Sequence, residues 1–440
     1  LTMARKMKDS GIEWIGEIPA DFSLYKLKYL LSSPLCYGAN ESGTLYSDIL
    51  PRYIRITDIS PNGTLKNSGM LSLDESSAQN YMLHEGDILF ARSGATVGKS
   101  FIYHNYYGRA AYAGYLIKAS FNRLVLPEFV YYYTCSSAYE IWKNSIFIQS
   151  TIQNIGADRY SNLPISVPNS IDKQLRIVRY LNNFCSKFDA IVYNLQTSIE
   201  DYKKLKQAVI TQAITKGVRG EREMKDSGVA WIGEIPKEWD IIKSSRIIKT
   251  TQNGLSRRDL EKSEGQIILK LKNITSDGKI DYSFLNRITL SQNELNTYAL
   301  TTGDFLFVRV NGSKSLVGKC AIFEAISEIV AYNDHIIRVK LSNQCYNRFF
   351  LWYLYSCCGK AEIDLHTSTA AGQYTISGDG LRDITLVFPP IDEQKEIADY
   401  LDAKCAEIDG LIAKKEQLVK ELESYKKSLI YEVVTGKREV

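Results

Sequence analysis

The fold of this chain is decided by residues 171–217, which read IDKQLRIVRYLNNFCSKFDAIVYNLQTSIEDYKKLKQAVITQAITKG. Alternating steps of three and four residues meet an apolar or aromatic side chain at eight of nine positions: Leu181, Phe184, Phe188, Ile191, Leu195, Ser198, Tyr202, Leu205 and Val209. A repeat of ~3.5 residues keeps one stripe of a helix facing a partner helix, as in a coiled coil. The stretch therefore predicts one helix of ~40 residues, or ~60 Å at ~1.5 Å per residue, ending near Gly217.

The same pattern recurs 220 residues later, at Leu401, Lys404, Ile408, Leu411, Lys415, Leu418, Leu422, Tyr425 and Leu429. Both stretches open alike, with Ile-Asp-Lys-Gln at residues 171–174 and Ile-Asp-Glu-Gln at residues 391–394. Their net charges are opposite, +4 over residues 171–217 (eight basic, four acidic) and −3 over residues 391–437 (eight basic, eleven acidic). We expect the two helices to bury their seams on each other. The alternative is a pair of ordinary core helices in separate domains, but such helices are usually about a third as long.

An internal repeat shows that the chain is duplicated. Residues 7–19, MKDSGIEWIGEIP, recur at residues 224–236 with eleven of thirteen positions identical. A second anchor, Gly86 to Arg92, recurs at the same offset as Gly303 to Arg309. Such self-similarity sets the architecture before any single motif does.

Each copy contains strand signals followed by helical spacing. Apolar and polar residues alternate from Tyr53 to Ile59, which predicts a half-buried strand, and Ile268 to Ile274 matches it in the second copy. The fold class expected is α+β, with two duplicated mixed α/β domains joined by two long antiparallel coiled-coil helices. The boundaries expected are residues 1–168 and 218–388 for the domains, and residues 169–217 and 389–440 for the helices.

The ends of the chain predict a circular, pseudo-two-fold arrangement. The first helix is followed by Thr-Lys-Gly and then by the repeat motif at Met224, whereas the second helix is followed by Thr-Gly-Lys-Arg at residues 435–438. The motif expected next is the one that stands at Met7. The two termini should therefore lie close together.

Composition excludes several classes of protein. Apolar residues make up 45% and charged residues 24% of the 440 residues, as in soluble globular proteins. No apolar run reaches the ~20 residues of a membrane helix, and no secretory signal opens the chain. Eight scattered cysteines without a C-x-x-C spacing read as reduced thiols, and four distant histidines make a zinc site unexpected. We expect a cytoplasmic protein whose net charge of +4 permits a nucleic-acid partner.

The sequence offers no catalytic site. Residues 94–100, GATVGKS, imitate a phosphate-binding P-loop but have three residues between the glycines where four are needed. A glycine-rich turn between strands explains them better. No serine-hydrolase or zinc-protease motif is present, nor the Asn-Pro-Pro-aromatic motif of adenine methyltransferases. We therefore expect no catalytic residue, no metal site and no cofactor in this chain.

Polar and basic residues cluster in matching loops of the two copies. Arg, Lys, Asn and Gln are the side chains that read base edges and hold phosphates. Each of these residues alone is better explained as an ordinary solvated loop residue, and their occurrence in both copies brings a binding role level with that explanation. The DNA-binding residues expected are Arg92, Ser93, Thr96, Lys99, Gln149, Thr151, Gln153 and Asn154 in the first copy, and Arg309, Asn311, Ser313, Lys314, Lys319, Thr369, Gln373 and Tyr374 in the second.

The chain resembles specificity subunits of Type I restriction-modification systems. The resemblance rests on the repeated MKDSG-x-x-WIGEIP motif, the Gly-Asp-Ile-Leu strand at Gly86, and the proline and glutamine that open each long helix. It implies that residues 1–168 and 218–388 are target-recognition domains, each reading one half of a split double-stranded DNA site. It also implies that the helices are spacer regions that bind two modification (methyltransferase) subunits. S-adenosylmethionine, ATP and magnesium would belong to those modification subunits and to restriction subunits.

Two other classes of function stay open at this stage. One is a fused or stand-alone DNA-modifying enzyme with an unrecognised catalytic motif, which a methylation assay of the chain alone would reveal. The other is a structural coiled-coil tether, which a DNA-binding assay would separate from a DNA reader.

Overall fold

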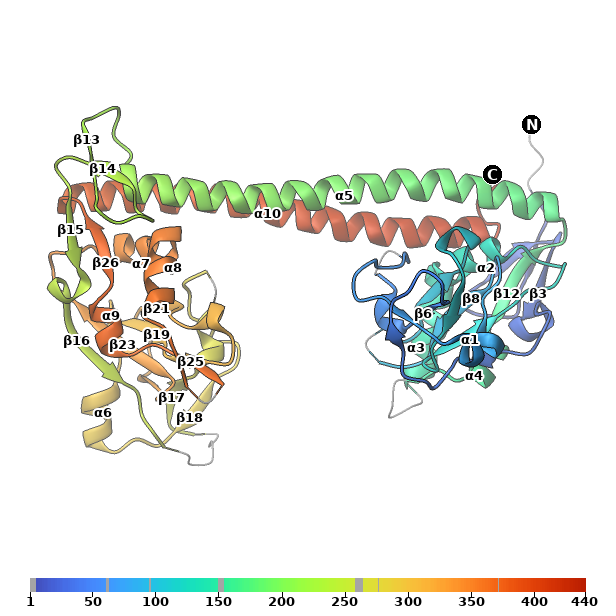
Figure 1. Cartoon of the computed structure of the whole chain (residues 1–440), viewed down its shortest axis with the longest axis horizontal. Helices are drawn as coiled ribbons and strands as arrows, with labels where there is room; N and C mark the ends of the chain where they lie inside the picture. Colours follow the sequence, from blue (N-terminus) through green and yellow to red (C-terminus); the bar gives the residue numbers. More distant parts are fainter. Residues whose placement is uncertain are drawn as a thin grey trace. The chain divides into compact units, whose positions relative to one another are not determined.

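The computed structural model describes residues 5–60, 63–94, 96–148, 154–257, 264–275, 277–370 and 372–440. The chain forms two compact units: unit 1, Leu1–Gln196 with Glu416–Val440, and unit 2, Thr197–Lys415. Two long helices, α5 (Ile171–Lys216) and α10 (Ile391–Val434), each contribute to both units (Figure 1). None of the described helices combines the length and the apolar composition that a membrane span requires.

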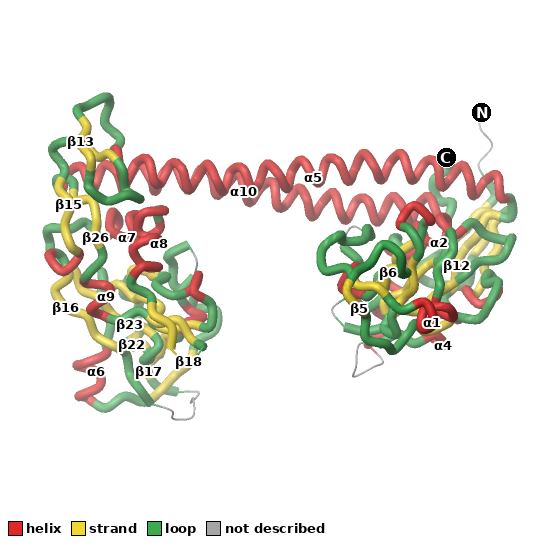
Figure 2. The backbone as a smooth tube through the Cα atoms, viewed as in Figure 1, coloured by secondary structure: helices red, strands yellow, loops and turns green. Residues whose placement is uncertain are grey.

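Unit 1 is built mainly from short strands, drawn in yellow in Figure 2. The strands are β1 (Met7–Asp9), β2 (Glu17–Pro19), β3 (Phe22–Lys26), β4 (Cys36–Tyr37), β5 (Thr44–Leu45), β6 (Arg52–Ile54), β7 (Leu71–Ser72), β8 (Ile88–Ala91), β9 (Ser100–Ile102), β10 (Ala110–Tyr112), β11 (Leu116–Ala119) and β12 (Pro164–Pro168). The helices are α1 (Glu75–Ala78), α2 (Pro127–Thr134), α3 (Ser137–Ile148) and α4 (Ala157–Ser161). Among the described residues the sheets run β10-β6-β7-β5, β4-β11-β8-β9, β12-β3 and β1-β2, and only the β10–β6 pair is parallel.

Unit 2 repeats this plan with additional strands. The strands are β13 (Met224–Asp226), β14 (Glu234–Pro236), β15 (Asp240–Lys243), β16 (Ile248–Asn253), β17 (Gln266–Leu269), β18 (Asn286–Ile288), β19 (Phe305–Val308), β20 (Val310–Asn311), β21 (Cys320–Ile322), β22 (Val330–Tyr332), β23 (Ile336–Leu341), β24 (Ser368–Ala370), β25 (Gln373–Thr375) and β26 (Thr385–Phe388). The helices are α6 (Gln292–Tyr298), α7 (Asn347–Tyr355), α8 (Cys357–Leu365) and α9 (Gly378–Arg382). The sheets described are β16-β23-β19-β21, β18-β17-β22, β20-β25-β24, β15-β26 and β13-β14. The predicted α+β fold class with two copies is confirmed.

One fully buried strand in each unit separates two hydrophobic cores. In β8, Ile88 and Phe90 face the core that contains α2, α3 and the adjoining parts of α5 and α10, whereas Leu89 and Ala91 face a second core. In β19, the alternate residues divide in the same way. Successive side chains of a strand point to opposite faces, so a continuous apolar run suits a strand that is covered on both sides.

The predicted strand over Tyr53 to Ile59 is wrong beyond Ile54. The backbone N–H of Arg55 donates to the buried carboxylate of Asp58 (2.8 Å), which also binds the Arg55 side chain. This closure forms a short 3₁₀ helix and turns the chain out of the sheet. The second copy does the same with Asn273, whose side-chain oxygen accepts from Lys270 N (2.9 Å). An alternating pattern cannot reveal such a side-chain-to-backbone closure.

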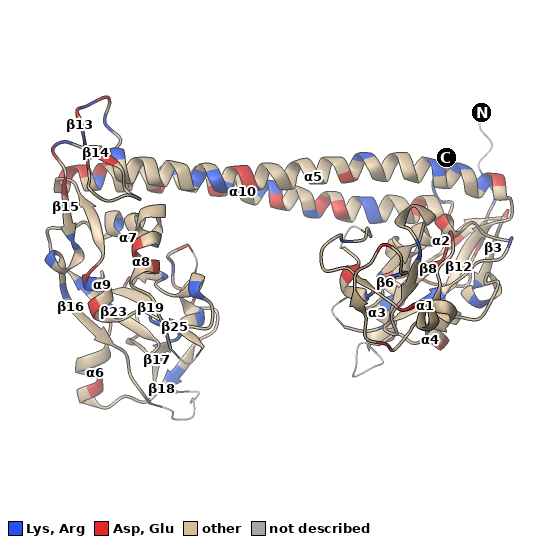
Figure 3. Ribbon diagram, in the orientation of Figure 1, with Lys and Arg blue, Asp and Glu red and all other residues tan. Residues whose placement is uncertain are grey.

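The two long helices run antiparallel within each unit. In unit 1, Lys426 Nζ lies 2.6 Å from the Asp189 carboxylate, and the Phe188 and Tyr425 rings are 5.7 Å apart. In unit 2, Lys206 Nζ lies 2.6 Å from the Asp409 carboxylate. Asp189 and Asp409 are equivalent in the repeat, as are Lys206 and Lys426, so the same ion pair forms twice. Acidic and basic residues are interspersed along α10 (Figure 3).

Every second residue predicted for the seam lies in it. At the alternate positions, the residue in the seam is the one that follows the predicted residue. The structure buries Cys185, Ile199, Cys405 and Val419, where the sequence favoured Phe184, Ser198, Lys404 and Leu418. A 3.5-residue repeat that includes Leu181 can continue with a step of three or a step of four. Most members of both series are apolar, and the chain buries the series that takes the step of four first. The other series forms a mainly apolar row beside the seam, called the apolar row below; its members are Phe184, Ile191, Ser198 and Leu205 on α5 and Lys404, Leu411, Leu418 and Tyr425 on α10.

A buried glutamine fixes the head of each long helix. The side chain of Gln174 accepts from Leu126 N (2.8 Å) and donates to the carbonyls of Leu124 and Pro168 (both 3.0 Å). Gln394 accepts from Tyr346 N (2.8 Å) and donates to Pro389 O (2.9 Å). Both glutamines are fully buried, so they tie each helix to the segment that precedes α2 or α7.

The chain ends meet in unit 1 as the circular arrangement predicts. The Arg5 guanidinium donates to the Gly436 carbonyl (3.1 Å), just beyond α10. In unit 2 the equivalent Arg222 donates to Lys216 O (3.0 Å), at the end of α5. The repeat hairpins follow with the same register, Met7 opposite Pro19 and Met224 opposite Pro236. In unit 1 the two terminal segments are thus held together by a non-covalent contact. In unit 2 the equivalent segments are joined by the continuous chain.

Candidate nucleic-acid interface

An arginine occupies the same backbone frame in both units, directly after the buried strand. In unit 1, Arg92 N donates to Tyr115 O (3.0 Å) and Arg92 O accepts from Ile155 N (2.9 Å). In unit 2, Arg309 N donates to His335 O (2.8 Å) and Arg309 O accepts from Ile376 N (2.9 Å). The chain is therefore held on both sides of each arginine by two other segments.

The side chain of Arg92 is oriented by two neighbours. Its Nε donates to Asn154 Oδ1 (3.3 Å), and its guanidinium carbon lies 5.0 Å from the centroid of the Tyr37 ring. Ser93 forms a β-bridge with Asn154. Within the described part of unit 1, no residue accepts from the terminal nitrogens of Arg92 by a hydrogen bond, and a stacked guanidinium with such nitrogens suits bidentate recognition of guanine or phosphate. Sequence reasoning missed Tyr37, because a lone tyrosine on a short strand gives no signal.

The other residues expected in unit 1 are separate from this cluster or cannot be placed. Thr96 and Lys99 lie in the turn between β8 and β9, where Lys99 N donates to Thr96 O (3.0 Å) and Lys99 is exposed. Gln149, Thr151 and Gln153 lie outside the described residues.

In unit 2 a small antiparallel sheet brings two of the predicted loops together. Strand β25 pairs with β20 on one side and with β24 on the other, so Tyr374 stands opposite both Asn311 and Thr369. Residues paired across neighbouring strands project on the same face, which makes Asn311, Tyr374 and Thr369 one polar row. Gln373 is exposed and projects on the opposite face.

The remaining residues expected in unit 2 divide between this sheet and a pocket. Arg309 donates through Nη1 to Asp334 O (3.2 Å). Ser313 N donates to Asn311 Oδ1 (3.0 Å), which closes the turn after β20. Lys314 and Lys319 line a pocket farther along the same loop. No group of three or more His, Cys, Asp or Glu suited to a metal ion is found in the described ranges.

A family model, the Type I restriction modification DNA specificity domain, matches residues 46–201 and 236–421. The chain belongs to this family. The two matches cover one copy each of the duplicated fold and extend into α5 and α10. The resemblance inferred from the repeat motif and the helix heads is therefore confirmed.

Curated relatives agree with this family. The chain is 24% identical over 316 residues to the Type I restriction enzyme StySPI specificity subunit of Salmonella potsdam, covering 72% of this chain and 66% of that protein. It is 25% identical over 293 residues to the EcoKI specificity subunit of Escherichia coli, covering 66% of this chain and 61% of that protein. The chain thus spans just under two thirds of the length of these two relatives. The MjaVIII specificity subunit of Methanocaldococcus jannaschii is 24% identical over 81% of this chain and 80% of its own length.

The fold is also found among solved structures. A chain from a study of complex assembly and conformational transition of the type I R-M system matches with a TM-score of 0.72 and 14% identity, covering 96% of this chain and 99% of that one. At this identity the match shows the fold alone. The contacts of individual loop residues with DNA stay predictions.

Proposed function

We propose that this chain is the DNA sequence-specificity subunit of a Type I restriction-modification complex, and that each unit reads one half of a bipartite site. The observation that carries the proposal is the arginine frame, which both units of this specificity-domain protein share. The frame is constant, but its surroundings differ: Asn154 and Tyr37 accompany Arg92, whereas the sheet that carries Tyr374 accompanies Arg309. A shared scaffold with different polar side chains suits two readers of different base sequences.

The long helices are proposed to bind the modification subunits through the apolar row beside the seam. Four of its members are strongly exposed: Ile191 (47%), Leu205 (48%), Leu418 (42%) and Tyr425 (52%). The row repeats every seven residues, which suits a partner helix. In an antiparallel pair the equivalent flanks of the two helices share one side, and in unit 1 the Phe184 and Tyr425 rings are 6.5 Å apart.

The opposite flank of the helices is already occupied. In unit 2 the carboxylate of Asp402 accepts from the side chains of Arg348 (3.0 Å) and Trp352 (2.8 Å), both on α7. In unit 1, Tyr132 on α2 donates to Asn182 at the equivalent position (2.5 Å). The domains therefore cover the polar flank and leave the apolar row to a partner.

The complete complex is proposed to contain two modification subunits, one on each unit, together with restriction subunits. S-adenosylmethionine, ATP and magnesium would be held by those partners, and this chain would be non-catalytic. The helices would also set the length of the unread DNA between the half-sites.

Co-expression with a modification subunit tests the proposal. The complex should methylate a split motif, as mapped by methylome sequencing, and the purified chain alone should methylate and cleave nothing. Methylation by the chain alone would instead support the alternative of a stand-alone modifying enzyme.

A further inference from the structure

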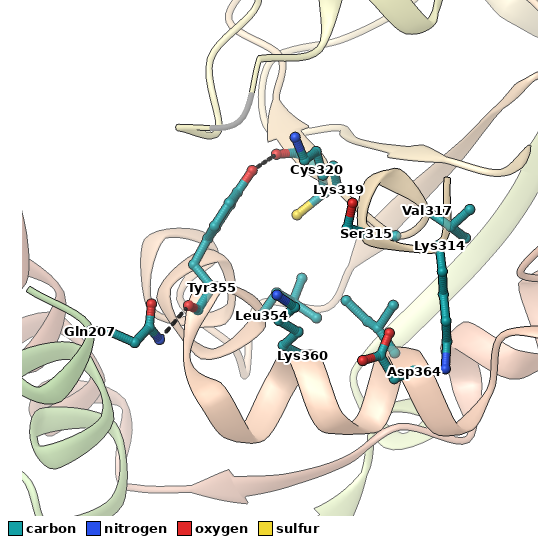
Figure 4. A pocket seen from close by; sticks show the side chains of 12 residues that line it. Gln207, Lys314, Ser315, Val317, Lys319, Cys320, Leu354, Tyr355, Lys360 and Asp364 are labelled. Atoms are coloured by element: carbon teal, nitrogen blue, oxygen red, sulfur yellow. Dashed lines mark hydrogen bonds between the residues drawn. The ribbon is translucent and has the colours of Figure 1, made fainter. Parts of the chain in front are cut away.

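A pocket of about 210 Å³ lies in unit 2 between the glycine-rich loop, α7, α8 and α5. The loop supplies Lys314 and Ser315 from a short 3₁₀ helix (Lys314–Leu316), and then Lys319. Helix α8 supplies Lys360 and Asp364, and α5 supplies Gln207 (Figure 4). Three chain segments that are distant in sequence, the glycine-rich loop, the consecutive helices α7 and α8, and α5, thus meet around one small volume.

The pocket carries an excess of positive charge. Three ammonium groups, those of Lys314, Lys319 and Lys360, line it, against one carboxylate, that of Asp364. Across the described residues, no carboxylate lies within ion-pair distance of any of the three lysines. Gln207 is already engaged, because its Nε2 donates to Tyr355 O (3.1 Å). The lysine charges are therefore available to a ligand.

The first copy of the fold closes the equivalent place with its own ion pair. There Lys143 Nζ lies 2.9 Å from the Glu140 carboxylate, and the Lys143 side chain packs against Gly98. In unit 2, Lys360 stands where Glu140 does, and Ile363 packs against Gly318 where Lys143 packs against Gly98. The glycine loop of unit 2 is also three residues longer, and it adds Lys314. Unit 1 therefore has a neutral lysine–glutamate ion pair at this place, whereas unit 2 has a pocket lined by lysines.

The remaining titratable groups of the pocket are neutral. Burial raises the pKa of the Cys320 thiol well above its ordinary value. Burial likewise raises the pKa of the Tyr355 hydroxyl, which donates to Cys320 O (2.8 Å). A protonated thiol and a protonated phenol neither repel an anion nor act as nucleophiles. The pocket is therefore equipped for binding an anion rather than for catalysis.

We infer that this pocket binds a phosphate group through Lys314, Lys319 and Lys360. The inference rests on the function proposed above in one respect: the phosphate would then belong to the DNA backbone beside the half-site read by unit 2. A free phosphate or diphosphate has the same chemistry and is the second source. Lys360 thereby joins the interface, although no sequence pattern singled it out.

The test measures DNA affinity of the full chain by fluorescence anisotropy across a salt series. The double variant K319Q/K360Q should bind all sequences more weakly, and the slope of log K against log salt should fall by about 1 if the lysines neutralise one phosphate. The variant K360E/I363K introduces the glutamate–lysine ion pair that unit 1 has at this place, so its side chains should fill the pocket. It should likewise bind DNA more weakly and with a lower salt slope. The matched control is Lys249→Gln on β16, an exposed lysine outside the pocket, which should leave the slope unchanged.

A second arm separates the two sources by titrating the chain with inorganic diphosphate in a calorimeter. If wild type binds DNA, both pocket variants keep its salt slope and diphosphate does not distinguish wild type from K319Q/K360Q, the inference is overturned. An unchanged salt slope with at least a tenfold loss of diphosphate affinity in K319Q/K360Q would assign the pocket to the free anion. If wild type binds no DNA, the proposed function fails. In that case the inferred phosphate site is supported only if diphosphate binds wild type and binds K319Q/K360Q at least tenfold more weakly. Diphosphate that binds neither protein overturns the inference in that case.

Discussion

Replacing the buried glutamines at the helix heads should destabilise the two units to different extents. Gln174→Ala removes three hydrogen bonds and leaves one N–H and two carbonyls without a partner in a buried site. Gln394→Ala removes two hydrogen bonds. Each buried polar group left unsatisfied costs about 1–3 kcal/mol. We therefore expect a loss of about 3–5 kcal/mol for Gln174→Ala and about 2–4 kcal/mol for Gln394→Ala.

Hydrogen exchange followed by mass spectrometry is the suitable assay, because two units need not unfold in one transition. Peptides from the first turns of α5 should lose protection in Gln174→Ala, and those of α10 should lose it in Gln394→Ala. Gln196→Ala, at an exposed position of α5, is the control and should change stability by less than about 0.5 kcal/mol. A loss below about 1 kcal/mol in Gln174→Ala would refute the argument that the glutamine holds the helix head.

Three further outcomes are expected. Gln373→Ala should relax recognition of only one half-site, by about 1–3 kcal/mol of discrimination, and motif mapping that shows both halves relaxed would contradict this. Tyr425→Asp should weaken binding of the modification subunit at least tenfold in a pull-down titration, whereas Tyr193→Asp, exposed away from the seam and the apolar row, should not; equal effects would argue against the row as the docking surface. Lengthening α5 and α10 by one heptad each keeps the seam in register and adds ~10 Å, so the methylated motif should gain ~3 unread base pairs, and an unchanged spacer in an active complex would show that the helices do not set it.

Much of the fold follows from the sequence because its signals are long or repeated. The thirteen-residue repeat and the 46-residue helix α5 are such signals, and both are borne out. The choice between Phe184 and Cys185 in the seam is different. Both phases satisfy a 3.5-residue repeat, and Cys185 is buried in the core that α2 shares, a tertiary contact that the helix sequence does not encode.

The candidate site was predictable only where the two copies repeat each other. The equivalence of Arg92 and Arg309 is visible as a shared offset, and the pairing of β20 with β25 then brings Asn311 beside Tyr374. Tyr37 and Lys360 reach the site from distant segments through tertiary packing. A single exposed lysine or tyrosine has no periodic or motif signature, so no sequence pattern could have identified them.

The central claim is that each unit reads its own half of a split DNA site, and exchanging one domain tests it most directly. Residues 237–388 would be replaced by the corresponding domain of another specificity subunit, with α5, α10 and both repeat motifs retained. Methylome sequencing of cells that carry the complete system would then report the motif. The account predicts that one half of the motif changes while the other half is preserved. A motif that changes in both halves would contradict it.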